Sequence, residues 1–399
     1  MFEFRRQPLK AVYTLYFAVS IFVRLPIWVV ASLLPAMRPR KAWTVSRTLF
    51  IWSIDAYVRS FYKVGFPVEP VLEGGPDVTG FVWVEPIPED YVVGEIKTMA
   101  DVNGVKPERI CGYWHGKKGA DGKFGQRAEP GERVLYVLHG GGYSMGSGGS
   151  KDDILSSPYT ICIPRRSPDI FQRSFGLEYR LSAAAPLEPK NPFPAVVLDA
   201  VAGYRYLIED RGFEPKNIVV FGDSAGAHLG IALIRYIILA DLPNLSIPGG
   251  FMALSPSCDW GDTHNDGSPQ CSVVANKNSD FVHAIISNGY TSRCLLGSLP
   301  PEELETNAWL SPSSLRLKKP EGVFKGFPPT LINAGGTEVA LDDKRMMRDR
   351  MIKDCGEEIV TYLEYEDAAH DFIMFRFLEP ERTQALDDIH NWLLKIFSE

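Results

Sequence analysis

A serine flanked by glycines and a separate run of glycines are the residues of this chain whose types and spacing could do chemistry. They lie in the segments Gly-Asp-Ser-Ala-Gly, residues 222–226, and His-Gly-Gly-Gly-Tyr, residues 139–143. A serine hydroxyl that attacks a carbonyl carbon turns the carbonyl oxygen into an oxyanion, and backbone N–H groups stabilise that charge. Glycines present such donors with no side chain in the way. The two segments together indicate a serine nucleophile beside an oxyanion-binding loop.

The residues around Ser224 predict a strand, a sharp turn and a helix. The β-branched run Asn217–Phe221 is typical of a buried strand, and the segment Ala225–Tyr236 is first small and then apolar, as in a helix packed on a sheet. This arrangement exposes a serine at a strained turn. A glycine-flanked serine alone is a weak signal, so its context carries the interpretation. A second strand pattern, Arg133–Leu138, ends directly at the glycine run.

A serine nucleophile needs a base that takes its proton, and His370 is the best placed of the seven histidines. It follows the strand pattern Val360–Tyr365 and lies in a loop, which is where a sheet collects functional residues. His139 is expected to support the glycine run, and His228 is expected within the helix after Ser224, facing sheet or solvent. A surface role is expected for the remaining histidines, His115, His264, His283 and His390.

A carboxylate that orients the histidine is expected after the strand pattern Leu331–Ala334. Glu338 lies nearest to the end of that strand and is the preferred candidate. Asp342 and Asp343 remain alternatives, because Glu338 could instead be an acid at the start of a helix. The order along the chain is then serine, acid, histidine.

These segments resemble those of the hormone-sensitive-lipase-like family of α/β-hydrolases, which also contains bacterial esterases and arylacetamide deacetylases. The resemblance covers roughly residues 130–395. The Gly-Asp-Ser-Ala-Gly segment matches without change, and the family's Tyr-Arg-Leu segment matches residues 179–181. The chain departs from the family at two positions. Glu338 stands where the family usually has Asp, and Asp371 stands where the family's histidine is usually followed by glycine.

The resemblance implies an α/β-hydrolase fold: a mostly parallel central sheet flanked by helices, with a helical cap built from the N-terminus and an insertion after a late strand. The residues that it implies for catalysis are Ser224, His370 and Glu338. The backbone N–H groups that it implies as oxyanion donors are those of Gly141, Gly142 and Ala225. The residues that would support the two motifs are His139, Gly140 and Asp223.

The composition is that of an ordinary globular protein, with 399 residues, 45% hydrophobic content and a formal net charge of −7. This negative balance argues against a nucleic-acid partner. No phosphate-binding loop and no Cys or His cluster with metal-ligand spacing occurs in the sequence, so neither a metal nor another cofactor is expected. The six cysteines are scattered, which fits buried thiols, with a Cys258–Cys271 disulfide as the alternative in an oxidising compartment.

The N-terminal residues 11–35 form an apolar segment that is long enough to cross a bilayer. Its single charge, Arg24, and the nearby Pro26 make a clean crossing costly, and cations flank it on both sides. A membrane-associated helix, a helix that caps a lipophilic pocket and a cleaved signal peptide all fit this segment, and the first two can coincide. The expected localisation is membrane-associated, for example at the endoplasmic reticulum, or cytoplasmic.

The expected organisation is an N-terminal region of two helices, residues 1–62, followed by a catalytic domain, residues 63–399. Residues 65–132 are expected to form an antiparallel entry to the sheet. Residues 258–327 interrupt the strand rhythm with polar and aromatic residues and are expected to form a lid over the substrate site.

The chain is therefore expected to hydrolyse a lipophilic carboxylic ester, with an acetyl or a short to medium acyl group, through an acyl-serine at Ser224. The alternatives are deacetylation or other amide hydrolysis, acyl transfer, and a non-catalytic ligand receptor on the same fold. The expected partners are a small lipophilic ester and a membrane surface that meets residues 11–35, with no nucleic acid. The exact substrate and the oligomeric state stay open.

Overall fold

A sheet of short, mostly buried strands lies at the centre of the computed structural model, which describes residues 1–67, 75–149 and 158–398. Its strands are β1 (Phe81–Val84), β2 (Ile110–Gly116), β3 (Val134–Leu138), β4 (Arg173–Glu178), β5 (Ile218–Asp223), β6 (Gly250–Leu254), β7 (Thr330–Gly335) and β8 (Val360–Tyr365). Within the described residues they pair in the order β1-β2-β4-β3-β5-β6-β7-β8. The pairs β1–β2 and β2–β4 are antiparallel, and the other neighbouring pairs are parallel.

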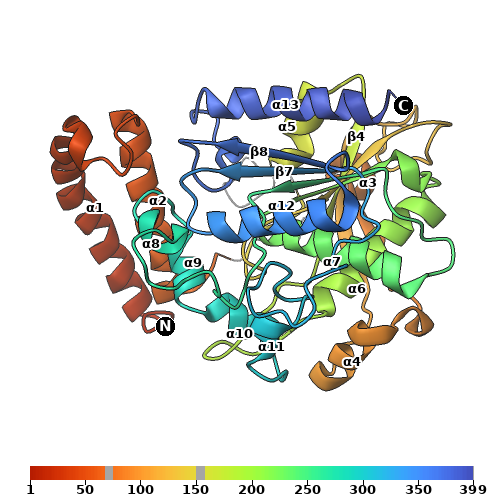
Figure 1. Ribbon diagram of the computed structural model, residues 1–399, viewed down its shortest axis with the longest axis horizontal. Coiled ribbons are helices and arrows are strands. Elements are labelled where there is room, and N and C mark those ends of the chain that lie inside the picture. Colours follow the sequence, from red (N-terminus) through yellow and green to blue (C-terminus); the bar gives the residue numbers. More distant parts are fainter. Residues whose placement is uncertain (68–74, 150–157, 399) are drawn as a thin grey trace.

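Helices cover both faces of this sheet (Figure 1). The α-helices of the described chain are α1 (Leu9–Leu33), α2 (Val45–Val64), α3 (Gly75–Val78), α4 (Gly94–Asn103), α5 (Tyr159–Arg166), α6 (Ala195–Arg205), α7 (Ala225–Ala240), α8 (Ser272–Ala275), α9 (His283–Ser287), α10 (Tyr290–Leu296), α11 (Glu303–Thr306), α12 (Leu341–Cys355) and α13 (Glu381–Ile396). Alternate strand residues point to opposite faces. Tyr136 of β3 therefore packs into the core beneath α6, α7 and α12, and Val137 into the core beneath α5 and α13.

This architecture confirms the predicted α/β-hydrolase fold with a mostly parallel sheet. The strand patterns that precede Ser224, Glu338 and His370 are observed as β5, β7 and β8, and the helix after Ser224 is observed as α7. In the expected antiparallel entry, β1 and β2 pair antiparallel, while residues 68–74 lie outside the described part of the chain.

The N-terminal helices α1 and α2 lie side by side at one end of the molecule (Figure 1). Trp28 of α1 packs on Trp52 of α2 with 6.1 Å between ring centroids. Helix α2 is joined to the sheet domain, because Arg47 pairs with Glu381 of α13 and the Trp43 indole donates a hydrogen bond to the Asp367 carbonyl at 2.8 Å. Helix α1 has no comparable cover. Among the described residues it is the one helix long and apolar enough to cross a membrane, and no residue of its most apolar stretch is buried.

The segment between β6 and β7 contains the predicted insertion at residues 258–327. It carries the short helices α8 to α11, and α9 packs against α2. The disulfide considered for Cys258 and Cys271 is not formed, since both are free cysteines. The division into an N-terminal region and a catalytic domain stays a prediction.

We expect Gly226→Ala to lower the free energy of unfolding by about 3 kcal/mol, because the added Cβ would lie 2.0 Å from the Leu138 carbonyl oxygen and would push α7 away from β3. Urea denaturation measures this change. The control is Gly131→Ala, which has open space around the new Cβ and bears only the strain of its positive φ (+74°), and which should cost only about 1 kcal/mol. Equal losses in the two variants would contradict the packing argument.

Candidate active site

The carboxyl ends of four parallel strands bring the predicted site residues together. The glycine run follows β3, Ser224 follows β5, Glu338 follows β7 and His370 follows β8. In an open α/β sheet the carboxyl ends of parallel strands share one edge, where ligands bind. Residues that are far apart in the sequence therefore meet at this edge.

Ser224 occupies a strained turn between β5 and α7. Its φ of 51° and ψ of −116° lie in a region that L-residues rarely adopt, and its N–H donates to the Leu254 carbonyl of β6 at 2.8 Å. The turn is tight because a Cβ at Gly222 would lie 2.2 Å from the Gly226 carbonyl oxygen. Small residues at both positions hold the serine at the start of α7, where the helix dipole favours negative charge.

The glycine run is held open towards Ser224. Gly141 and Gly142 have φ of +104° and +58°, conformations that glycine adopts without steric cost. The backbone N–H groups of Gly141, Gly142 and Ala225 donate no recorded hydrogen bond to a described residue. They are therefore available to a negatively charged oxygen in the cavity.

Two aromatic contacts support this loop. The ring of His139 stacks on Tyr179 with 4.1 Å between centroids, and its Nδ1 lies 2.8 Å from the Gly140 carbonyl oxygen. The Tyr143 hydroxyl lies 2.6 Å from Nδ1 of His228 on α7, so it joins the glycine run to the helix after Ser224. His228 is fully buried, and its contact with Tyr143 was not predicted from its expected place on the helix.

Glu338 and His370 form a buried pair. The Glu338 Oε2 lies 2.8 Å from Nδ1 of His370. Its other oxygen, Oε1, accepts hydrogen bonds from the Ser255 hydroxyl at 2.9 Å and from the Gly335 N–H at 2.5 Å. The ammonium of Lys344, which is also fully buried, lies 3.2 Å from Oε2. Burial alone would raise the pKa of Glu338, but Lys344 and then His370 lower it to about 2.

The alternative acids lie elsewhere. Asp342 accepts a hydrogen bond from the Ser272 N–H at 2.7 Å, and Asp343 accepts one from the Cys258 N–H at 3.1 Å. Neither has a recorded hydrogen bond or ion pair with His370 among the described residues. The structure thus brings Glu338, rather than Asp342 or Asp343, against the histidine.

The hydroxyl of Ser224 is near the base but does not bond to it in this state. Its recorded hydrogen-bond partner among the described residues is the hydroxyl of Ser257, at 3.4 Å. The Nε2 of His370 instead lies 3.2 Å from Oδ2 of Asp371. Apo sites often have long or misaligned catalytic hydrogen bonds that tighten when substrate is bound, so this geometry is compatible with a serine–histidine pair.

Two further buried acids adjoin the pair. Burial raises the pKa of Asp280 to about 6 and raises the pKa of Asp223 well above its usual range. Asp280, Glu338 and His370 each have an atom of a type that binds metals, and these three atoms lie within 4.8 Å of one another, as the ligands of a metal ion would. The Lys344 ammonium already supplies a cation to Glu338, so the cluster is better described as a balanced charge network.

An apolar cavity of about 100 Å³ opens above Ser224 and His370. Its wall on one side comes from α2, and its wall on the other side comes from the insertion. The α2 residues are Ile54, Tyr57, Val58 and Phe61, and the insertion residues are Phe281, Val282 and Ile285. The part of the N-terminal region that covers the site is therefore α2, whereas α1 lies outside it.

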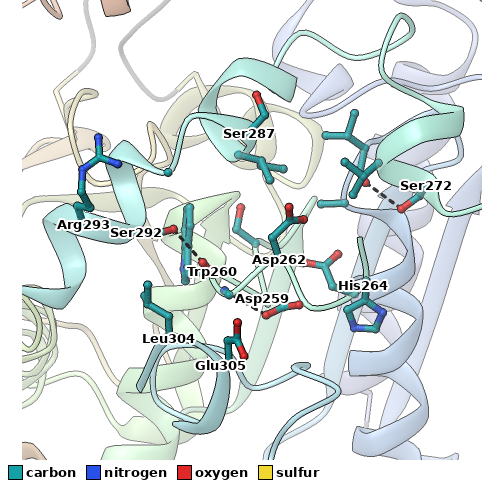
Figure 2. A pocket seen from close by; sticks show the side chains of 18 of the residues that line it. Asp259, Trp260, Asp262, His264, Ser272, Ser287, Ser292, Arg293, Leu304 and Glu305 are labelled. Atoms are coloured by element: carbon teal, nitrogen blue, oxygen red, sulfur yellow. Dashed lines mark hydrogen bonds between the residues drawn. The ribbon is translucent and has the colours of Figure 1, made fainter. Parts of the chain in front are cut away.

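A second, polar cavity of about 330 Å³ reaches Ser257, whose hydroxyl neighbours Ser224. Figure 2 shows its labelled side chains, with the carboxylates of Asp259, Asp262 and Glu305 around the cavity and Arg293 on the side opposite His264. Ser224 itself lines the apolar cavity, whereas the polar cavity reaches its neighbour Ser257.

Sequence analysis missed several residues of this network. Ser255, Lys344 and Asp280 all lie against the Glu338–His370 pair, yet a serine, a lysine and an aspartate outside any motif give no signal by type alone. Asp371 was noted only as a departure from the family, and its contact with His370 was not predicted. Ser255 directly follows β6, and that position is the one cue to its role. His115, expected at the surface, is buried and lies 3.2 Å from the Gly148 carbonyl oxygen.

Comparison with known proteins gives a consistent result. A model of the α/β-hydrolase fold family matches residues 175–374. The chain is 29% identical to an acetyl-hydrolase of Streptomyces hygroscopicus, over 64% of this chain and 73% of that protein. It is 26% identical to an esterase of Acinetobacter venetianus, over 64% of this chain and 73% of that protein.

Solved structures show the same fold. An esterase from the bacterial hormone-sensitive lipase family superposes with a TM-score of 0.55 at 24% identity, covering 86% of this chain and 97% of that one. The structure of EstE5 soaked with ethyl alcohol superposes with a TM-score of 0.56 at 25% identity, covering 88% of this chain and 99% of that one.

We expect Glu338→Gln to slow the labelling of Ser224 by a fluorophosphonate by roughly 10³-fold, because a neutral amide no longer stabilises the protonated histidine that forms as the serine attacks. Mass spectrometry of the labelled protein measures the rate. The matched control is Asp342→Asn, which removes a nearby acid in the first turn of α12 and should leave the rate unchanged. Thermal melts of both variants show that the chain is folded; a folded Glu338→Gln protein that is labelled as fast as the wild type would exclude Glu338.

Proposed function

The chain belongs to the α/β-hydrolase family, and on this basis we propose that it cleaves lipophilic esters through a covalent acyl-serine at Ser224. It is a carboxylic ester hydrolase of the hormone-sensitive-lipase-like kind. The class of ester and the roles of the individual residues are proposed from the geometry of the site.

One observation carries this proposal: a serine at a strained strand-to-helix turn faces unpaired backbone N–H groups and lies next to a buried histidine–carboxylate pair. The N–H groups of Gly141, Gly142 and Ala225 have no recorded partner among the described residues, and His370 and Glu338 are 2.8 Å apart. A nucleophile, its base, a group that orients the base and donors for an oxyanion are the parts that acyl transfer to serine requires.

The proposed reaction has two steps. In the first, Nε2 of His370 takes the proton of the Ser224 hydroxyl while Oγ attacks the ester carbonyl, and the three N–H groups hold the oxyanion. The protonated histidine then gives its proton to the leaving alcohol, and an acyl-serine remains. In the second step His370 takes a proton from water as the water oxygen attacks the acyl carbon, and it returns this proton to Oγ of Ser224 as the carboxylic acid leaves. Glu338 stabilises the histidine cation in both steps.

The apolar cavity supports a lipophilic substrate. Its wall is made of aromatic and aliphatic side chains from α2 and the insertion, and its volume of about 100 Å³ fits an acetyl or short acyl group better than a long chain. We propose that α2 and residues 258–327 together form the cap of this cavity. The polar cavity at Ser257 then offers room for the more polar part of the ester.

We expect Ser224→Ala to abolish fluorophosphonate labelling and to reduce the turnover of p-nitrophenyl acetate to below a few percent of wild type, because no nucleophile remains. Turnover of the acetate, butyrate, octanoate and palmitate esters should fall with chain length, since the cavity is small. Ser257→Ala is the matched control, as it removes a neighbouring hydroxyl and should keep the labelling. Retained turnover in a folded Ser224→Ala protein would sink the proposed function.

We also propose that α1 places the enzyme on a membrane. A helix that is apolar on all sides is stable when lipid or protein surrounds it, and no described part of the chain covers the outer face of α1. Its 25 residues span about 37 Å at 1.5 Å per residue, enough for the apolar core of a bilayer. The exposed guanidinium of Arg24 can reach towards the lipid headgroups by extending its side chain.

We expect three acidic substitutions on the outer face of α1, Val19→Asp, Phe22→Asp and Val23→Asp combined, to release the protein from phosphatidylcholine vesicles in a flotation assay, because charges in the apolar layer are costly. The matched control replaces three exposed apolar residues elsewhere, namely Val78, Val102 and Leu239, with Asp. Flotation of the α1 variant to the same extent as the control would show that α1 does not hold the protein on lipid.

A further inference from the structure

The carboxylate of Asp371 lies against Nε2 of His370, the nitrogen that takes the serine proton in the proposed reaction. No step of that reaction requires a carboxylate at this position. Asp371 Oδ2 is 3.2 Å from Nε2, and Glu338 Oε2 is 2.8 Å from Nδ1. Each ring nitrogen of His370 therefore faces its own carboxylate. The Ser224 hydroxyl, from which Nε2 must take a proton, lies against Ser257 instead.

The backbone at Asp371 is in an unusual conformation for a residue with a side chain. Its φ of 48° and ψ of 34° place it in the left-handed region, which costs an L-residue roughly 1–2 kcal/mol. Its N–H donates to the Ser255 hydroxyl at 3.0 Å, and this hydroxyl in turn donates to Glu338. The residue is thus locked into the same network as the catalytic pair.

The burial of the Asp371 side chain also lowers the stability of the fold. This side chain is 6% exposed, it lines the apolar cavity, and its Oδ1 has no hydrogen-bond partner among the described residues. A buried carboxylate oxygen without a partner lowers stability. The backbone conformation and the unpaired side-chain oxygen of Asp371 each lower the stability of the fold. Strained residues of this kind are frequent at functional sites.

We propose that Asp371 is a positioning residue: it holds His370 in a resting orientation by pairing with Nε2, and it thereby sets the pH at which this nitrogen becomes available to Ser224. The proposal rests on the proposed function, because it concerns the same base. It adds a second carboxylate, on the opposite side of the ring from Glu338, that acts on the ground state rather than on the transition state.

The other charged or titratable groups around His370 do not take this role. They come from every element packed against the ring or its partners, and they are Glu338, Asp280, Asp223, Lys344 and Tyr159. Burial raises the pKa values of Asp223 and Tyr159, which favours their neutral forms. It also raises the pKa of Asp280, to about 6, and the Lys344 ammonium shares the charge of Glu338. Asp371 is the carboxylate in contact with Nε2 itself.

The direction of the effect follows from the charges. Burial alone lowers the pKa of His370, but Asp371 and Glu338 raise it well above its ordinary value. A histidine acts as a base only after it has lost its Nε2 proton to solvent. Its Nε2 lone pair can then take the Ser224 proton as the bond from Oγ to the carbonyl carbon forms. A raised histidine pKa therefore moves the rise of activity to higher pH, and removing Asp371 moves it back.

The experiment compares wild type with Asp371→Asn and Asp371→Gly. Asn keeps the size of the side chain and removes its charge, while Gly removes the whole side chain and adopts the left-handed conformation freely. The rate of fluorophosphonate labelling and kcat/KM for p-nitrophenyl acetate are measured from pH 5 to 9. We expect the midpoint of the acidic limb to fall by at least one pH unit in both variants, so that the rates at pH well below both midpoints rise about tenfold.

Two controls separate this inference from other effects. Asp241→Gly makes the same replacement at another aspartate with positive φ (46°), exposed after α7, and it should leave the midpoint unchanged. Ser224→Ala should abolish labelling in every background, and its failure would count against the proposed function rather than against Asp371. Unchanged midpoints in both Asp371 variants, with Ser224→Ala inactive, would overturn the inference alone. A loss of rate in both variants without a shift of the midpoint would overturn it as well.

Discussion

A fully buried carboxylate that two cationic side chains share is the interaction on which the rest of the site depends. Moving the charge of Glu338 out of water costs several kcal/mol, and only close partners offset that cost. Lys344 at 3.2 Å and His370 at 2.8 Å supply the charges, while Ser255 and the Gly335 N–H satisfy the second oxygen. Because these partners come from α12 and from the ends of β6, β7 and β8, one carboxylate fixes how these elements meet.

The parallel sheet explains why this network can form at all. The last residues of the parallel strands lie at the same edge, so Ser224, Glu338 and His370, from distant parts of the chain, reach one place without long loops. Gly222 allows the close contact of α7 with β5, and Gly226 allows its close contact with β3, so that Ser224 lies at the sheet edge beside the glycine run. The insertion after β6 lies on this edge and contributes Phe281, Val282 and Ile285 to the cavity wall.

Sequence patterns were sufficient to predict the fold, and the residues that they singled out in motifs lie together at one edge of the sheet. Ser224 and the glycine run have local signatures, since a tight turn and a close backbone approach restrict the residue types, and the strand patterns predicted where each element ends. Lys344 had no such signature, because its role comes from the fold of α12 against Glu338 and from burial, which no local pattern encodes. Which helix covers the site could not be predicted either. Helix α1 has the stronger apolar signal, but α2 packs on the site because Arg47, and Trp43 just before the helix, join it to the sheet domain.

The order of α1, α2 and cavity connects the two proposals on substrate and membrane. Helix α2 has Trp52 against α1 on one side and Tyr57 and Phe61 on the cavity wall, so a single helix separates the exposed apolar surface from the reacting serine. Under the two proposals, an ester dissolved in lipid passes this helix to reach Ser224. The N-terminal end of α2 is fixed by the pair of Arg47 and Glu381, whereas the wall residues lie between Ile54 and Phe61, from the middle of the helix onwards. Under the two proposals, substrate that enters from the lipid side moves the wall side chains of α2, while the N-terminal end of the helix stays anchored by Arg47 and Glu381.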